Sequence, residues 1–442
     1  MNLKARKFFF YLFIAIFVLV GAYLIVSAQG LVFDYQTLDF MRTGGIFLNY
    51  TPSESQVEIN GSVRDYGSTI GNLLSSGTFL NNLAPGNYNV KISYPGYSSW
   101  QKSLTVTPGV VTSASQVILW PETWSNKKIS DYKTADFWLT SDGLVIKTDQ
   151  NLLYFGNEKI KGTSVYLSDE NRNIVITGDQ NGYYAVNLDN PGAYFAIDLP
   201  KGTKIEKWFF HPFDQNAVVG TGEKYIYYVS TVNGSTGKLY SLPDNQFSYQ
   251  NGNEIFVAEK SGNIFSANLV LRTNTNIETG ITGGLNDLST DAGGDELYIL
   301  DNSGKLHEYD RSNGTSTVFS SSSLPFSKIY PSPDGNRLAL ISGTGAVTIL
   351  AIKDYKMDYQ VMSGDFWNVK TPGPASDFIW LPGIPNYGLI LENGNLILSE
   401  LDERSPQNQY EMESNISKAV LSNNNIYFIK DGSLFEVALK QK

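Results

Sequence analysis

The chain has 442 residues, of which 42% are hydrophobic and 17% are charged, and its formal net charge at pH 7 is -10. This length predicts at least two domains, because single hydrophobic cores rarely grow beyond about 250 residues. The acidic balance would repel a phosphate backbone, so we expect no nucleic acid partner. The absence of cysteine excludes disulfides, thiolate nucleophiles and most structural zinc sites.

The N-terminal segment has the pattern of a membrane anchor. Lys4, Arg6 and Lys7 precede an unbroken apolar run over residues 8–26. As a helix this run matches the ~30 Å hydrocarbon core of a bilayer. Because the basic residues lie only on its N-terminal flank, the N-terminus is expected in the cytoplasm and the bulk of the chain outside.

These features predict a single-pass protein of the cell membrane. Residues 1–7 would be cytoplasmic, residues 8–28 would cross the membrane, and residues 29–43 would form a polar and aromatic spacer. A cleaved signal peptide is the alternative, since residues 26–28 end in small side chains, although a cleaved apolar region is usually shorter. In both cases the remainder is exported.

Residues 44–121 are expected to form a small β-sandwich. Apolar and polar residues alternate in Ile46–Tyr50 and Val57–Gly61, which is typical of half-buried strands. Pro-Gly pairs at Pro85-Gly86 and Pro95-Gly96 predict tight turns, because proline presets φ and glycine accepts the opposite hand.

This segment resembles a PEGA domain. The resemblance is carried by Leu83–Ile92, Pro95-Gly96-Tyr97, Trp100 and Thr105–Gly109, and by Val57–Gly61. It departs at the family's naming motif, where Pro52 is followed by Ser53-Glu54-Ser55. The resemblance implies a sandwich of bacterial or archaeal envelopes without catalytic residues, and the whole arrangement resembles uncharacterised envelope proteins of bacteria with reduced genomes.

Residues 125–442 contain a unit that recurs about every forty residues, the spacing of four-stranded propeller blades. Its strongest copy, Pro331-Ser332-Pro333-Asp334-Gly335, resembles the turn of TolB-type propeller repeats. Weaker copies surround His211–Asp214 and Ser289–Gly294. We expect a β-propeller of eight blades. Seven is the alternative, because the first unit is short and would then donate the strand that closes the ring.

The sequence offers no catalytic, cofactor or metal site. His211 and His307 are too few and too isolated for a metal centre or a triad. The aspartates at 287, 291 and 295, and the polar residues at 169, 171 and 173, lack the order that a calcium loop needs. We therefore expect a protein that is not an enzyme, with a propeller-type hydrolase or lyase acting on envelope polysaccharide as the alternative.

Aromatic residues are the candidates for partner contact. Trp208, Trp367 and Trp380 could stack on sugars or anchor a protein, although in repeat architectures such residues more often fill gaps between blades. The longest insertion, Tyr355–Pro374, carries Phe366 beside Trp367 and is the preferred contact surface. The predicted function is a membrane-anchored, extracytoplasmic binding or scaffold protein that presents its propeller to an envelope protein or glycan; its oligomeric state stays open.

Overall fold

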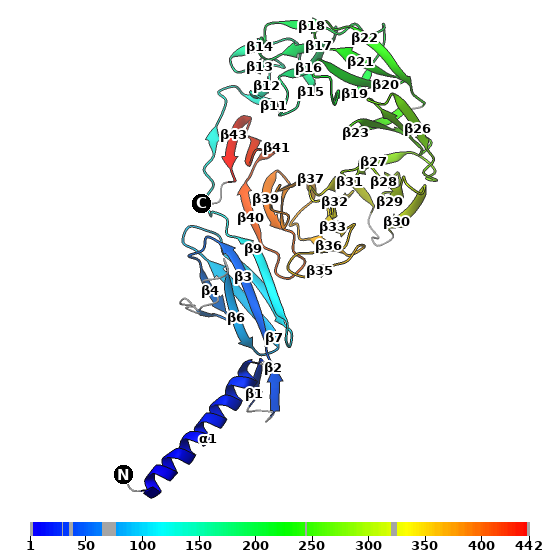
Figure 1. Cartoon of the computed structure of the whole chain (residues 1–442). Coiled ribbons are helices and arrows are strands. Elements are labelled where there is room, and N and C mark those ends of the chain that lie inside the picture. The colour runs from blue at the N-terminus through cyan, green and yellow to red at the C-terminus, as the bar shows by residue number, and fades with distance from the viewer. Residues whose placement is uncertain are drawn as a thin grey trace.

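The structure is a computed structural model that describes residues 3–28, 30–34, 39–63, 77–243, 245–319 and 325–439. It is mostly β, with one helix in the described part, α1 (Leu3–Ala28). Figure 1 shows α1 at one end, a small sandwich next to it, and a ring of sheets beyond the sandwich. In the described part of the chain, no helix is long and apolar enough to cross a bilayer.

A short hairpin follows the helix, within the segment that the sequence predicts as a spacer. Its strands β1 (Leu31–Asp34) and β2 (Asp39–Arg42) pair antiparallel. Thr43 ties the base of the hairpin, since its backbone N–H and its hydroxyl both donate to the carbonyl of Gly30, at 2.7 Å and 2.8 Å. The chain then enters the sandwich directly.

Two sheets form the sandwich, with orders β6-β3-β9 and β5-β4-β7-β8. Alternating side chains face inward, as in β8, where every second residue from Trp100 to Val106 is buried. Strands β3 and β9 run parallel, whereas the other pairs are antiparallel. The strands are β3 (Gly44–Thr51), β4 (Gln56–Ile59), β5 (Ser62–Val63), β6 (Thr78–Leu83), β7 (Gly86–Ser93), β8 (Trp100–Val106) and β9 (Val111–Ile118).

Eight four-stranded antiparallel sheets follow among the described residues, and in Figure 1 they succeed one another around a ring. We number them first to eighth in chain order. The first four comprise β11 (Thr134–Thr140), β12 (Gly143–Thr148), β13 (Leu153–Phe155) and β14 (Glu158–Ile160); β15 (Ser164–Leu167), β16 (Ile174–Asp179), β17 (Gly182–Asn187) and β18 (Tyr194–Ala196); β19 (Ile205–Phe210), β20 (Ala217–Gly222), β21 (Tyr225–Ser230) and β22 (Thr236–Ser241); and β23 (Asn245–Asn251), β24 (Glu254–Glu259), β25 (Ile264–Asn268) and β26 (Thr273–Ile277).

The fifth to eighth sheets repeat the pattern. They comprise β27 (Leu285–Thr290), β28 (Glu296–Asp301), β29 (Leu306–Asp310) and β30 (Thr315–Phe319); β31 (Phe326–Pro331), β32 (Arg337–Ser342), β33 (Val347–Ala351) and β36 (Phe366–Val369); β37 (Ala375–Trp380), β38 (Tyr387–Glu392), β39 (Asn395–Glu400) and β40 (Gln409–Glu413); and β41 (Ile416–Ser422), β42 (Asn425–Lys430), β43 (Ser433–Ala438) and β10 (Lys127–Lys128). The second strand is mostly buried in six of the eight sheets and half buried in β12 and β42, as expected for strands covered by neighbouring sheets on both sides.

Two features recur from sheet to sheet. In all eight sheets the register between the first and second strands shifts near the start of the first strand. Such a shift marks a β-bulge, which bends the first strand.

The second recurring feature is a backbone hydrogen bond in the second to eighth sheets. The N–H of the residue just beyond the third strand donates to a carbonyl in the turn between the first two strands. These seven bonds join 188 to 173, 231 to 216, 269 to 253, 311 to 295, 352 to 336, 401 to 386 and 439 to 424.

The ring is closed by a strand from outside the repeat. β10 precedes the first sheet in the chain but pairs with β43 as the outer strand of the eighth. The N–H of Ile129 extends this pairing by donating to the carbonyl of Leu434 at 2.9 Å. Radial closure leaves only short, protected strand edges, whereas an open array of this many strands would invite edge pairing.

Candidate functional site

Two of the predicted contact residues lie inside the propeller and not on its surface. Trp208 is 3% exposed and packs between the second and third sheets, and Trp380 is 7% exposed and packs between the sixth and seventh. The indole N–H of Trp380 donates to the carbonyl of Tyr330 at 2.9 Å. The expectation that these two tryptophans reach a partner is therefore wrong, because each fills the space between adjacent sheets.

The insertion Tyr355–Pro374 is also placed differently from the expectation of an exposed contact loop. It contains a small hairpin, β34 (Tyr355–Lys356) and β35 (Gln360–Val361), and then β36, the outer strand of the sixth sheet. Trp367 on β36 is partly buried and donates its indole N–H to the carbonyl of Leu401 at 2.8 Å. Phe366 is 44% exposed and is the one predicted contact residue with an open surface.

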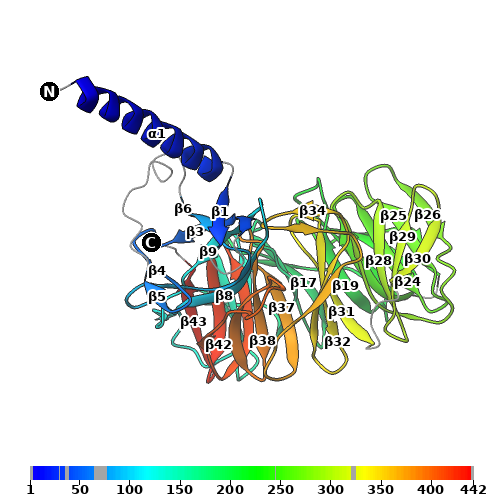
Figure 2. The ribbon, with the colours of Figure 1, turned by 90° about the horizontal axis from the view of Figure 1, so that it is seen from below.

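The hairpin β34–β35 contacts the sandwich of the same chain. Asp358 at its tip accepts hydrogen bonds from the backbone N–H of Ser115, at 2.8 Å, and from the Ser115 hydroxyl, at 2.5 Å. Ser115 lies on β9, an edge strand of the sandwich. In Figure 2 the hairpin and the sandwich lie on the same side of the propeller.

The loop between β39 and β40 covers a second open edge of the sandwich. On β8, the N–H and C=O of Gln101 bond to the side-chain amide of Asn408 at 3.0 Å and 3.1 Å. The N–H of Ser103 donates to the carbonyl of Ser405 at 2.9 Å. Backbone groups that an edge strand would leave unpaired are thus bonded by the propeller.

Buried charges fill the space between these edges. Lys102 is fully buried, and its ammonium lies 2.8 Å from Glu400 Oε2 and 3.7 Å from Asp402 Oδ2. Arg404 pairs with Asp402 at 2.5 Å and with Asp358 at 3.1 Å. Arg404 also donates to the carbonyl of Ser113 on β9, at 2.7 Å.

The surroundings of the Asp402 carboxyl favour its ionised form. Burial alone would raise the pKa of the Asp402 carboxyl, but the hydrogen bonds and charge of Arg404 and the charge of Lys102 hold it below its ordinary value. Trp100 adds an indole N–H that donates to Glu400 at 3.0 Å. A network of this kind is specific in geometry, because any missing member leaves a buried charge without its partner.

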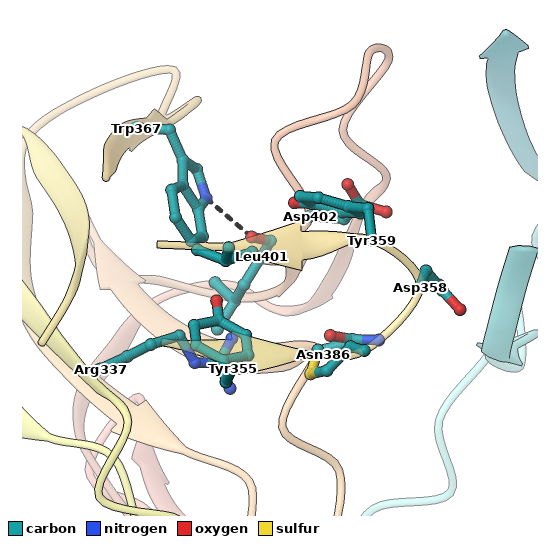
Figure 3. Close-up of a pocket in the computed structure, with 10 residues that line it drawn as sticks. Arg337, Tyr355, Asp358, Tyr359, Trp367, Asn386, Leu401 and Asp402 are labelled. Atoms are coloured by element: carbon teal, nitrogen blue, oxygen red, sulfur yellow. Dashed lines mark hydrogen bonds between the residues drawn. The ribbon is translucent and has the colours of Figure 1, made fainter. Parts of the chain in front are cut away.

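The space beneath the hairpin is filled by side chains (Figure 3). Only about 10 Å³ remains among them, no more than one water needs. The Arg337 guanidinium lies 5.4 Å from the ring centroid of Tyr355 and 5.0 Å from that of Trp380, and it donates to the carbonyl of Pro385 at 2.6 Å. This part of the molecule is a packed joint and offers no room for a ligand.

A larger space lies where the first and eighth sheets meet. We call it the seam groove; it has a volume of about 760 Å³ and is lined by parts of Ile129–Tyr132, Leu139–Leu144, Phe155–Asn157 and the eighth sheet. Two strands near the groove are short. β13 has three residues where the third strands of the other sheets have five or six, and β10 has only two.

A second crevice lies between the turns of the fourth and fifth sheets and has a volume of about 620 Å³. Its lining is polar and includes Asn251, Asn253 and Asn268. Arg311 bonds across it to Glu254 at 2.8 Å and to the carbonyl of Gly294 at 2.7 Å. These bonds hold the two sheets together and leave a shallow polar surface.

Within the described ranges, no group of three or more His, Asp or Glu residues is arranged to hold a metal ion. His211 accepts the N–H of Asp214 at 3.0 Å, which shapes a turn. His307 lies 2.9 Å from Asp301 on a neighbouring strand of the same sheet. Both histidines have local structural partners.

Comparison with known proteins identifies the first domain and supports the second. Residues 43–118 match the PEGA domain. No curated protein matches the chain. Among solved structures, the computationally designed Ika8 protein is 11% identical, with 70% of this chain and 98% of that chain covered and a TM-score of 0.50.

Two β-propellers also align. BamB from Moraxella catarrhalis is 13% identical, with 71% of this chain and 98% of that chain covered and a TM-score of 0.46. YCF48, solved with a bound D1 peptide, is 14% identical, with 61% and 91% covered and a TM-score of 0.43. At 11% identity the likeness to the Ika8 protein concerns the fold alone.

Proposed function

We propose that this chain is a membrane-anchored, extracytoplasmic scaffold of the cell envelope that holds a propeller in a fixed orientation for a protein or glycan partner. In this proposal the eight sheets are the eight blades of one wheel, with β10 as the closing strand. The observation that carries it is the junction between the domains, where propeller loops bond the open edges β8 and β9 and bury Lys102 against Glu400 and Asp402.

A junction held by hydrogen bonds and ion pairs suits a scaffold protein. A flexible linker would let the propeller tumble, whereas a buried polar network fixes one geometry. The PEGA domain would then set both the distance and the direction of the propeller relative to the membrane. Catalysis on envelope polysaccharide stays the alternative.

The proposed anchor rests on the apolar run at residues 8–26 and its basic N-terminal flank. In α1 the side chains of Phe13, Phe17 and Leu19 are 66%, 78% and 70% exposed, so no part of the described protein covers them. Exposed apolar side chains of this density support the proposal that α1 lies in an apolar environment.

Topology can be tested with single cysteines, since the chain has none of its own. In intact cells a membrane-impermeant maleimide should label Ser261→Cys on the propeller and spare Asn2→Cys. Both should react after lysis. Labelling of both before lysis, or of neither, contradicts an N-terminus inside and a propeller outside.

Anchoring and binding are tested together by capture. Solubilised native membranes are passed over the immobilised full chain, and bound proteins and glycans are identified. Replacement of Phe13 and Phe17 by arginine should release the chain from membranes during alkaline extraction, whereas Phe79→Arg on the sandwich should not. An unaltered chain that alkaline extraction releases, or that captures nothing, opposes the proposal.

A further inference from the structure

The seam groove combines an apolar floor with an acidic rim. Its floor includes Leu144, Ile146 and Phe155. One wall carries Tyr132, whose ring stacks on Tyr154 with centroids 4.5 Å apart and planes at 20°, so its orientation is fixed. Tyr427 also lines the groove. Apolar and aromatic groups of this kind bind the carbon chains of a ligand in a pocket of ordinary size.

Carboxylates surround this floor. Asp131, Asp142, Glu170 and Glu436 line the groove, and its described lining contains no lysine or arginine. Asp142 and Glu436 belong to the first and eighth sheets, so the charges face the groove from both sides of the seam.

The nearest cations compensate these charges weakly. Lys128 lies 3.6 Å from Asp131 and Lys127 lies 3.8 Å from Glu436, and the two lysine side chains are 48% and 78% exposed. Exposed pairs at such distances contribute little. Glu170 also accepts a hydrogen bond from the Ser422 hydroxyl, and Glu436 accepts one from the Tyr427 hydroxyl at 3.2 Å. Neither hydroxyl carries a positive charge, so the carboxylates keep the capacity to pair with an incoming cation.

We infer that the seam groove binds a positively charged, extended peptide segment of a protein partner. Lysine or arginine side chains would lay their aliphatic stems on the apolar floor and place their charged ends against the rim carboxylates, with Tyr132 and Tyr427 available to the cations as ring faces. This inference rests on the proposed function, since it names the chemistry that the propeller recognises. A neutral glycan could use the rings but would bring no cation to the carboxylates.

The test uses the full chain in detergent micelles and three labelled probes: an octapeptide of alternating lysine and glycine, an octapeptide of alternating glutamate and glycine, and cellohexaose. Binding is measured by fluorescence anisotropy at low and high salt. Asp142→Asn with Glu436→Gln removes two rim charges, and Ser141→Trp fills the groove from an exposed position. Glu54→Gln with Glu278→Gln, both exposed and outside the groove lining, gives the same change in net charge as a matched control.

The lysine peptide should bind the unaltered chain and the control equally, and more weakly as salt rises. Asp142→Asn with Glu436→Gln removes two charge pairs with the peptide, so its affinity for the lysine peptide should fall about 2- to 30-fold. Ser141→Trp should abolish binding. Unchanged thermal unfolding shows that both variants fold. Equal affinity for all variants, or binding only of cellohexaose, overturns the inference. Capture of a partner from native membranes by the Ser141→Trp chain would also overturn the inference. That result would still agree with the proposed scaffold function.

Discussion

Lys418 in the first strand of the eighth sheet lies 2.7 Å from Asp136 in the first strand of the first sheet. Its ammonium also donates to the carbonyl of Phe137 at 2.7 Å. Although 282 positions separate the two residues, they meet because the ring returns to its start. The same strand position in other sheets also bonds forward, as when Lys328 donates to the carbonyl of Ser376 and Asp287 accepts the N–H of Ile329.

Replacement of Lys418 by methionine should loosen this closing contact. Both side chains are about one third exposed, so we expect a loss of about 1 kcal/mol and a fall of about 2 °C in Tm. Lys133→Met is the control, because Lys133 is 74% exposed and lies 3.5 Å from an exposed Asp149. Scanning calorimetry measures the Tm of both variants. Equal Tm values would mean that the contact between Lys418 and Asp136 does not stabilise the protein.

Replacement of Lys102 by methionine should be far more damaging. It leaves Glu400 buried without a cation, while Asp402 keeps Arg404 as its partner at 2.5 Å. An uncompensated buried charge costs about 3–5 kcal/mol in comparable cases. Adding Glu400→Gln should restore part of the loss, since one uncompensated charge disappears. Urea unfolding of the two single variants and the double variant measures this coupling, and simple additivity would argue against a direct pair.

Trp380→Phe should cost more stability than Trp208→Phe, by about 1 kcal/mol. Both tryptophans are buried, and both changes remove a similar volume. Trp380 donates a hydrogen bond to Tyr330, whereas the indole N–H of Trp208 has no partner among the described residues. Chemical unfolding of the two variants gives the comparison, with Phe366→Ala as an exposed aromatic that should change stability little.

Acid should weaken the fifth sheet through Asp301. Burial would raise the pKa of this carboxyl, but hydrogen bonds from Ser303, His307 and the backbone N–H of Lys305 lower it to about 2. The folded pKa lies below the ordinary value, so this carboxylate stabilises the protein above about pH 4 and the contribution is lost as the pH falls toward 2. Asp301→Asn should therefore destabilise at pH 5 but not at pH 2; a constant difference between the two pH values would contradict this.

Much of the fold could be predicted from the sequence. The prediction of a PEGA domain is confirmed for residues 43–118, because its Pro-Gly turns and alternating strands are local patterns. The Ser-Pro-Asp-Gly turn could be predicted because it too is a local pattern. Gly335 takes a φ of 68° there, and its N–H donates to the carbonyl of Ser332.

The junction was missed although the sequence held a signal for it. Lys102 occupies an inward position in β8 between Trp100 and Leu104. A lysine on an apolar face predicts a buried partner of opposite charge. That partner is almost 300 positions away in the loop at Glu400–Arg404, so no local pattern could identify it. The prediction that Trp208 and Trp380 contact a partner was wrong for a related reason. Composition does not distinguish an indole on the surface from one that fills a gap between sheets.

In the proposed scaffold, the sandwich and the propeller form one rigid unit. Electron–electron distance measurement between nitroxides on Glu54→Cys and Thr275→Cys tests it most directly, because the chain has no other cysteine and both positions are exposed. We predict a single narrow distance distribution that broadens when Lys102→Met is added. A broad distribution in the labelled chain with Lys102 intact would contradict the account.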